Sequence, residues 1–218
     1  MMRKAVLALL PCVLLLSAAA SAQPEGLEIT PIFNYAWTSR VATWDGDFDI
    51  GNSSSWGVML NVDIESYTYK GTAIEILYNR QDSKAEFYEY GTRIKTDLFD
   101  MSVDYYQIGV ANRLHYDKVE PFGEFLLGAT RFSAKEDITI NDRTFRPSDE
   151  WMFSVTLGAG VRLMFSERIG LRAHGRLLMP MTFSGGGLWC GGGGCSVGVG
   201  GSSWFMQGDV GAGIILRF

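Results

Sequence analysis

The chain has 218 residues and a formal net charge of −5; 47% of the residues are hydrophobic, 13% are aromatic and 26 are glycine. The acidic balance excludes the basic footprint of a nucleic-acid-binding protein. No segment approaches 18 uninterrupted apolar residues, which excludes membrane-spanning helices. Strands that alternate polar and apolar residues could still conceal this hydrophobicity in a membrane.

The first 22 residues have the pattern of a secretory signal peptide. Two basic residues precede an apolar core, residues 5–16, and Ala20-Ser21-Ala22 forms a small-residue cleavage site. A membrane helix is the alternative, but the apolar core is short and contains Pro11. Cleavage would leave one domain, residues 23–218, and would take the net charge from −5 to −7 because two positive charges are removed.

Beyond this segment, eight runs place apolar residues at every second position, the period of a strand with two unlike faces. The connections between the runs alternate between long and short. The eight runs cover residues 27–37, 55–65, 71–79, 101–114, 120–133, 153–165, 169–177 and 204–218.

The fourth run changes phase in its middle. Met101 and Val103 follow one register, whereas Tyr106, Ile108 and Val110 follow the other. Either a β-bulge near Tyr106 or a membrane segment that begins only at Tyr106 would explain the change.

The last run, residues 204–218, carries an apolar face about 15 residues long, more than the roughly 9–11 that a tilted strand needs to cross a bilayer. Trp204 and Phe218 stand at the two ends of this face, where interfacial aromatic girdles lie. The run is therefore expected to be the closing strand of a membrane barrel.

A terminal strand of this kind, residues 211–218 ending in Phe218, resembles the small eight-stranded outer-membrane β-barrel proteins of Gram-negative bacteria. The resemblance implies that the chain is exported to the outer membrane and surrounded by its lipid. It also implies that the last strand carries the signal read by the barrel-assembly machinery. The residues of that signal would be Gly211, Ile214, Leu216 and Phe218.

Eight runs joined in this way predict an all-β fold, a transmembrane up-and-down antiparallel eight-stranded β-barrel. Both termini would lie at the end with short turns, and the four long connections would face out of the cell. A soluble barrel of the lipocalin kind is the rival fold, with its faces reversed. Aromatic residues at the two ends of the apolar face, and charges that alternate with glycine on the polar face, favour the membrane barrel.

The polar face predicts a charged lumen. An eight-stranded barrel has room inside only for side chains or a small ligand, so these charges must pair or be solvated. An ion-pair plug is favoured, and a conductive path lined by charge is the alternative. The predicted lumen network contains Glu28, Asp63, Glu65, Glu75, Glu124, Arg162, Arg172, His174, Arg176, Asp209 and Arg217.

The two histidines, His115 and His174, do not predict catalysis. Neither stands in a His-X-Ser pattern, so the resemblance to lipid-deacylating barrels fails there. His174 is flanked by Arg172 and Arg176 on the predicted lumen face, which favours a structural role. No cofactor or enzymatic activity is expected.

The fourth long connection is rich in glycine and contains Cys190 and Cys195. A closed zinc site needs four ligands, which this segment lacks, so a disulfide formed after secretion is the favoured prediction. Specific function is expected in the outer loops, which carry aromatic residues suited to a surface partner. The sequence thus predicts a structural or surface-interaction role. The alternatives are a narrow channel for ions or small apolar molecules and a lipid-active enzyme.

Overall fold

The computed structural model describes residues 26–38, 41–42, 46–64, 71–89, 95–135, 138–140, 143–145, 149–191, 194–204 and 206–218. The predicted signal peptide lies outside these residues. In this described part of the chain, no helix is long and apolar enough to cross a membrane.

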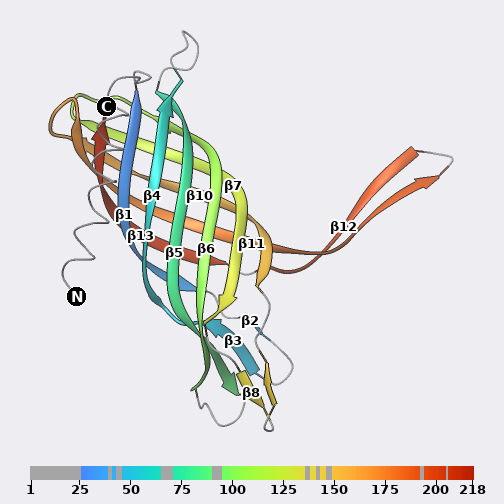
Figure 1. The fold of residues 1–218 in the computed structure, drawn as a ribbon. Helices are drawn as coiled ribbons and strands as arrows, with labels where there is room; N and C mark the ends of the chain where they lie inside the picture. Colours follow the sequence, from blue (N-terminus) through green and yellow to red (C-terminus); the bar gives the residue numbers. More distant parts are fainter. Residues whose placement is uncertain are drawn as a thin grey trace, which may run out of the picture.

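Eight strands form the barrel. They are β1 (Leu27–Thr38), β4 (Ser53–Asp63), β5 (Thr72–Glu89), β6 (Lys95–Arg113), β7 (Val119–Ala134), β10 (Glu150–Met164), β11 (Ile169–Gly191) and β13 (Gln207–Arg217). Each strand pairs antiparallel with the next in this order, and β13 pairs with β1, so the sheet closes on itself (Figure 1). The predicted all-β, eight-stranded up-and-down barrel is confirmed.

The strands are staggered around the barrel. Following paired residues once around the wall from Glu28 leads back to Thr38, ten residues further along β1. Such a stagger over eight strands implies a tilt of about 45°, so each residue advances about 2.4 Å along the axis. The 12 residues of β1 therefore cover nearly the thickness of a bilayer's hydrocarbon core.

The two faces of the wall are opposite in character to those of a soluble barrel. Phe33 and Leu157 point outward and are 65% and 48% exposed, whereas the inward neighbours Asn34 and Thr156 are 1% and 0% exposed. Large apolar side chains thus cover the outside and polar side chains fill the inside, which excludes the lipocalin-like alternative.

This sidedness can be tested with spin labels. Labels attached to cysteine at Leu157 and Ile214 should collide with oxygen dissolved in hydrocarbon, because both side chains are exposed on the apolar outer face. A label at Arg168, which is exposed in the short turn between β10 and β11, should collide instead with a water-soluble paramagnetic relaxation agent. Water-accessible labels at Leu157 and Ile214 would contradict the sidedness.

The phase change in β6 does not come from a bulge near Tyr106. The pairing of β6 with both neighbours is continuous there, and Met101, Val103 and Tyr105 all point inward. The outward alternation of exposed apolar residues begins at Tyr106. The second explanation is therefore correct: at residues 101–105, which precede Tyr106, the inner face is apolar and the outer face carries the polar residues Ser102 and Asp104.

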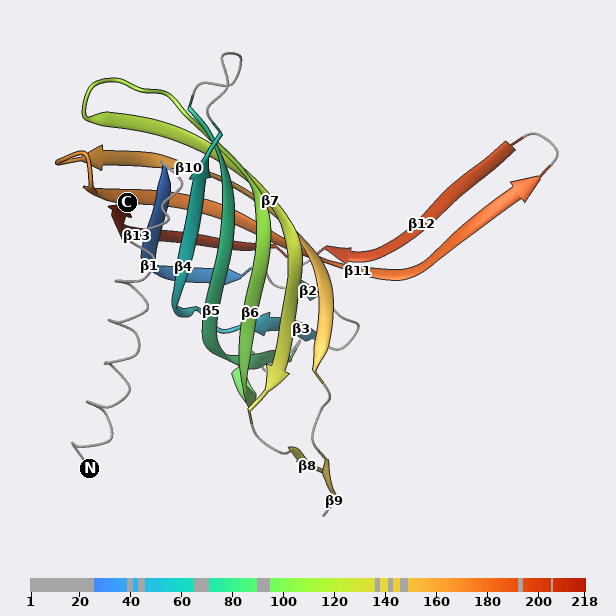
Figure 2. The same ribbon diagram turned by 45° about the horizontal axis from the view of Figure 1, so that its top comes forward.

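The long connections contain further strands at one end of the barrel (Figure 2). These are β2 (Val41–Ala42), β3 (Gly46–Ile50), β8 (Ile138–Ile140), β9 (Arg143–Phe145) and β12 (Gly194–Trp204). β3 pairs with the extended end of β5, and β8 pairs with β9. The second connection continues the β5–β6 hairpin beyond the barrel wall, as far as Tyr88 opposite Lys95.

The fourth connection differs from the expected glycine-rich loop. β11 and β12 form a two-stranded ribbon that projects away from the barrel (Figures 1 and 2), with Cys190 paired opposite Cys195 in its register. Trp204 belongs to β12, so the closing strand β13 has 11 residues rather than about 15. The predicted closing strand was too long because Trp204 continues the alternation of apolar residues in β13, although β12 ends at Trp204 and β13 begins only at Gln207.

Candidate functional site in the lumen

The interior is built in layers, and the layer nearest the short turns is centred on Glu28. This carboxylate is 1% exposed and accepts from three guanidinium groups. The ion-pair distances are 3.0 Å to Arg113, 2.6 Å to Arg162 and 2.6 Å to Arg217. These three arginines come from β6, β10 and β13, so one acid of β1 connects strands around much of the barrel.

Two more acids balance this layer. Asp63 lies 2.7 Å from Arg113, and Glu120 lies 2.9 Å from Arg162. Sequence reasoning missed Arg113 and Glu120 because both stand at strand ends beside a short turn, in the two runs with the least regular alternation. Counting inward positions from Tyr106 along β6 would have placed Arg113 on the lumen face.

The middle layer is formed by Arg172 between two acids. Its guanidinium group lies 2.8 Å from Glu75 and also contacts Glu124, and it stacks on the ring of Phe122 at 4.1 Å. Gly158 provides the room that this arrangement needs, because a Cβ there would overlap Glu124 and lie 2.8 Å from Cγ of Arg176.

Arg176 and His174 lie next along β11. Arg176 holds Asp209 through two hydrogen bonds, of 3.0 Å and 2.7 Å, a bidentate pair with no exposed side-chain surface. Nε2 of His174 lies 3.0 Å from the side-chain amide of Asn34. Within the described residues no carboxylate hydrogen-bonds His174, so the orienting acid of a catalytic histidine is not in place.

Amide and apolar layers close the end with long connections. Tyr105 donates to Gln207 at 2.5 Å, Gln207 contacts Gln81, and Gln107 donates to Ser154 at 3.0 Å. Beyond them lies an apolar cluster that packs across the barrel. The cluster contains Ile50, Ala85, Met101, Val103, Tyr105 and Leu178.

The remaining predicted residues occupy several places. Glu65 lies outside the described residues, and the structure describes Cys190 and Cys195 only through their backbone pairing. Of the four predicted assembly-signal residues, Gly211 points inward against Asn34. The other three are exposed: Ile214 and Leu216 on the outer face of β13, and Phe218 directly after the strand ends.

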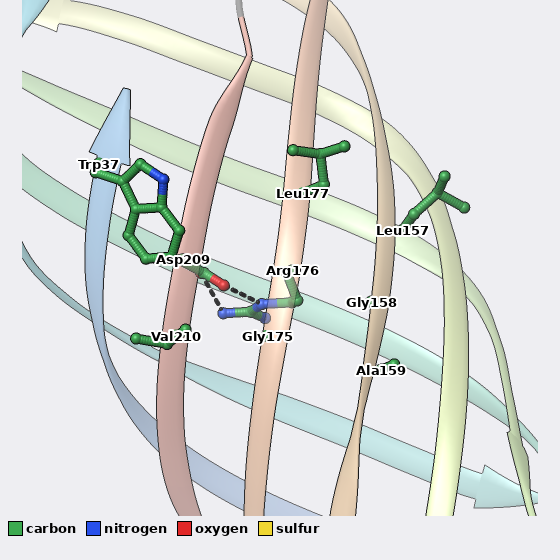
Figure 3. A pocket seen from close by; sticks show the side chains of 9 residues that line it. All are labelled: Trp37, Leu157, Gly158, Ala159, Gly175, Arg176, Leu177, Asp209 and Val210. Atoms are coloured by element: carbon green, nitrogen blue, oxygen red, sulfur yellow. Dashed lines mark hydrogen bonds and ion pairs between the residues drawn. The ribbon is translucent and has the colours of Figure 1, made fainter. Parts of the chain in front are cut away.

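A shallow depression of about 440 Å³ lies in the outer face of the wall (Figure 3). It arises where Ala159 and Gly175 carry too little side chain to fill the space between their larger neighbours. The larger neighbours are Trp37, Leu157, Leu177 and Val210. The Arg176–Asp209 pair lies behind this wall without exposed side-chain surface, so the depression offers mainly apolar contacts.

Comparisons with known proteins agree with this architecture. The family model described as the outer membrane protein beta-barrel domain matches residues 6–181. Among solved structures, Neisserial surface protein A has a TM-score of 0.56 at 13% identity, covering 89% of this chain and 98% of that one. No curated protein sequence shows significant similarity to the chain.

Two further solved structures are similar at a lower level. Ail, the attachment invasion locus protein of Yersinia pestis, was solved with the heparin analogue sucrose octasulfate; it has a TM-score of 0.49 at 13% identity, over 89% of this chain and 100% of that one. The outer membrane protease OmpT of Escherichia coli has a TM-score of 0.49 at 8% identity, over 90% and 98% of the two chains.

Proposed function

This chain belongs to the outer membrane protein β-barrel domain family, and from that premise we propose that it is a non-enzymatic barrel whose own side chains close its lumen. Its location is the outer membrane of a Gram-negative cell. The long connections at the outer end are the part available to a surface partner.

The observation that carries this proposal is the layered filling of the lumen. Ion pairs centred on Glu28 occupy the end with short turns, and Arg172 with its two acids occupies the middle. The apolar cluster around Val103 and Tyr105 fills the other end. An eight-stranded barrel is narrow enough for such side chains to occupy its whole cross-section.

Planar-bilayer recording tests the closed lumen. The purified protein should give little steady conductance, because ions would have to displace buried ion pairs and pass an apolar layer. A variant in which Glu75, Glu124 and Arg172 are all alanine removes the middle layer and serves as the comparison for leakage. Large and stable conductance steps from the unaltered protein would overturn the proposal.

A narrow ion path is the second candidate, and one observation favours it. Oε1 of Glu124, Nδ1 of His174 and Nη1 of Arg176 are buried and have no hydrogen-bond partner among the described residues. Buried polar atoms of this kind are commonly satisfied by internal water. The same recording decides between the two candidates.

Three smaller proposals concern export and the outer end. The first 22 residues are a cleaved signal peptide, and the closing strand is the segment bound by the barrel-assembly machinery. Cys190 and Cys195 form a disulfide that closes the tip of the β11–β12 ribbon; their opposition in the ribbon's register supports this pairing.

A further inference from the structure

The ion pairs inside the barrel join one more acid than base. Among the described residues they involve six carboxyl groups and five guanidinium groups. Three acids and three arginines form the layer around Glu28, and Asp209 forms a separate pair with Arg176 (Figure 3). The excess acid therefore lies in the middle layer, where Glu75 and Glu124 share Arg172.

The three groups of the middle layer are deeply buried and touch one another. Glu75, Glu124 and Arg172 are 0%, 5% and 2% exposed. Nη2 of Arg172 lies 3.5 Å from Oε1 of Glu75 and also contacts Oε2 of Glu124. The two carboxyl groups are hydrogen-bond neighbours of each other as well. Because an ionised carboxylate can only accept, a hydrogen bond between the two acids requires a proton on one of them.

No second cation pairs with these two acids in the described part of the lumen. Arg176 acts on Glu124 from β11, but two hydrogen bonds hold its guanidinium group on Asp209. His174, also on β11, contacts the amide of Asn34 instead of a carboxylate. The residues opposite the two acids on the flanking strands are all uncharged: Asn61, Gly109, Ala111 and Gly158.

One oxygen of the pair favours the neutral form of an acid. Oε1 of Glu124 is buried and has no hydrogen-bond partner among the described residues. Burying an ionised oxygen without a partner costs far more free energy than burying a neutral one. A protonated Glu124 avoids that cost, and the carboxylate of Glu75 then balances Arg172 at 2.8 Å.

We propose that Glu75 and Glu124 form a proton-binding site in the lumen, in which the two carboxyl groups share one proton at neutral pH. When the pH rises, the O–H bond breaks, the proton passes to hydroxide in the solvent, and the middle layer gains one uncompensated negative charge. Two ionised acids side by side repel each other, so alkaline conditions weaken this layer. The site holds its proton whether or not ions cross the lumen, so it stands or falls separately from the proposed function.

Infrared difference spectroscopy of the folded protein in detergent micelles tests the site directly. Ordinary aspartic and glutamic acids are ionised at neutral pH, so the carbonyl stretch of a protonated carboxyl group reports a proton that the structure holds. One such band is expected at neutral pH and should disappear at alkaline pH. Glu124→Gln and Glu75→Gln should each abolish it, whereas Glu167→Gln in an exposed turn should retain it. Its absence from the unaltered protein would overturn the proposal.

Urea unfolding of the glutamine variants gives an independent test. Either Glu75→Gln or Glu124→Gln should raise the unfolding equilibrium constant by less than about tenfold, because the remaining acid still pairs with Arg172. The double variant should raise it by about a hundredfold or more, since Arg172 is then buried without an acid. Large losses from both single variants would show instead that each acid forms an ion pair of its own.

The same measurement at several pH values checks the proton itself. The folded barrel should hold one proton more than the unfolded chain, so its unfolding constant should rise about tenfold per pH unit from about pH 5 until the pair is ionised. Either single glutamine variant should lose this dependence. A dependence on sodium concentration in place of pH would mean that a metal cation balances the two acids, which contradicts the proposal.

Discussion

Replacing Glu28 by alanine is expected to destabilise the folded barrel by about 3–5 kcal/mol. The change leaves Arg113, Arg162 and Arg217 close together with their shared acid removed. Arg113 and Arg162 are nearly fully buried, so water cannot replace the lost carboxylate at low cost. The loss should therefore exceed that of any single exposed ion pair in the described residues.

Urea unfolding in detergent micelles, followed by gel migration of unheated samples, measures this effect. Glu167→Ala is the matched control, because Glu167 is exposed in a short turn and its loss should change stability by less than about 0.5 kcal/mol. Changing Glu28→Met together with Arg162→Met should cost less than the two single changes combined, since the second removes an unpaired charge. A small effect of Glu28→Ala would show that the three arginines are solvated.

The position of Glu28 explains why this layer matters for closure as well as for filling. Its partners Arg113, Arg162 and Arg217 are 85, 134 and 189 residues away in the sequence. The contact with Arg217 cannot form until the first and last strands, β1 and β13, are both in place. The ion pairs therefore favour the closed register over slipped ones, in which the charged residues would face lipid.

Alternation alone was enough to predict the barrel, because each wall strand buries one face and exposes the other. The strongest runs, such as Phe153–Phe165 in the sequence, correspond directly to β10 with its outward Leu157 and inward Thr156. Alternation gave a wrong prediction where a strand does not have one buried and one exposed face. At residues 101–105, before Tyr106, β6 lies outside the apolar band; both of its faces are buried there, and the apolar residues point inward.

The charged residues of the lumen were predictable as a set but not as pairs. Alternation places Arg172 and Arg176 on the inner face, yet it cannot say that one meets two acids and the other meets Asp209 alone. Those partners depend on the ten-residue stagger, which arises from pairing between strands and leaves no mark in any single strand. The β11–β12 ribbon was missed for a related reason, because glycine carries no strand pattern.

Inward glycines mark where neighbouring strands approach too closely for a side chain, and Gly109 on β6 is a clear example. A Cβ there would overlap the carbonyl oxygen of Phe125 and lie 2.7 Å from Cα of Leu126. Both obstacles belong to the backbone of β7, so they can move only if the strands separate. Gly109→Ala is therefore expected to destabilise the barrel by about 3 kcal/mol and to reduce the folded fraction.

Gly123→Ala is the matched control on the adjoining strand β7. Its Cβ would point outward, and the nearest atom is 3.9 Å away, an ordinary van der Waals distance. The same substitution should then change stability by less than about 0.5 kcal/mol. Unheated and heated samples compared on gels measure the folded fraction of each variant. If the two variants fold equally well, close approach of β6 and β7 at Gly109 does not limit closure, and the wall there must be looser than the register implies.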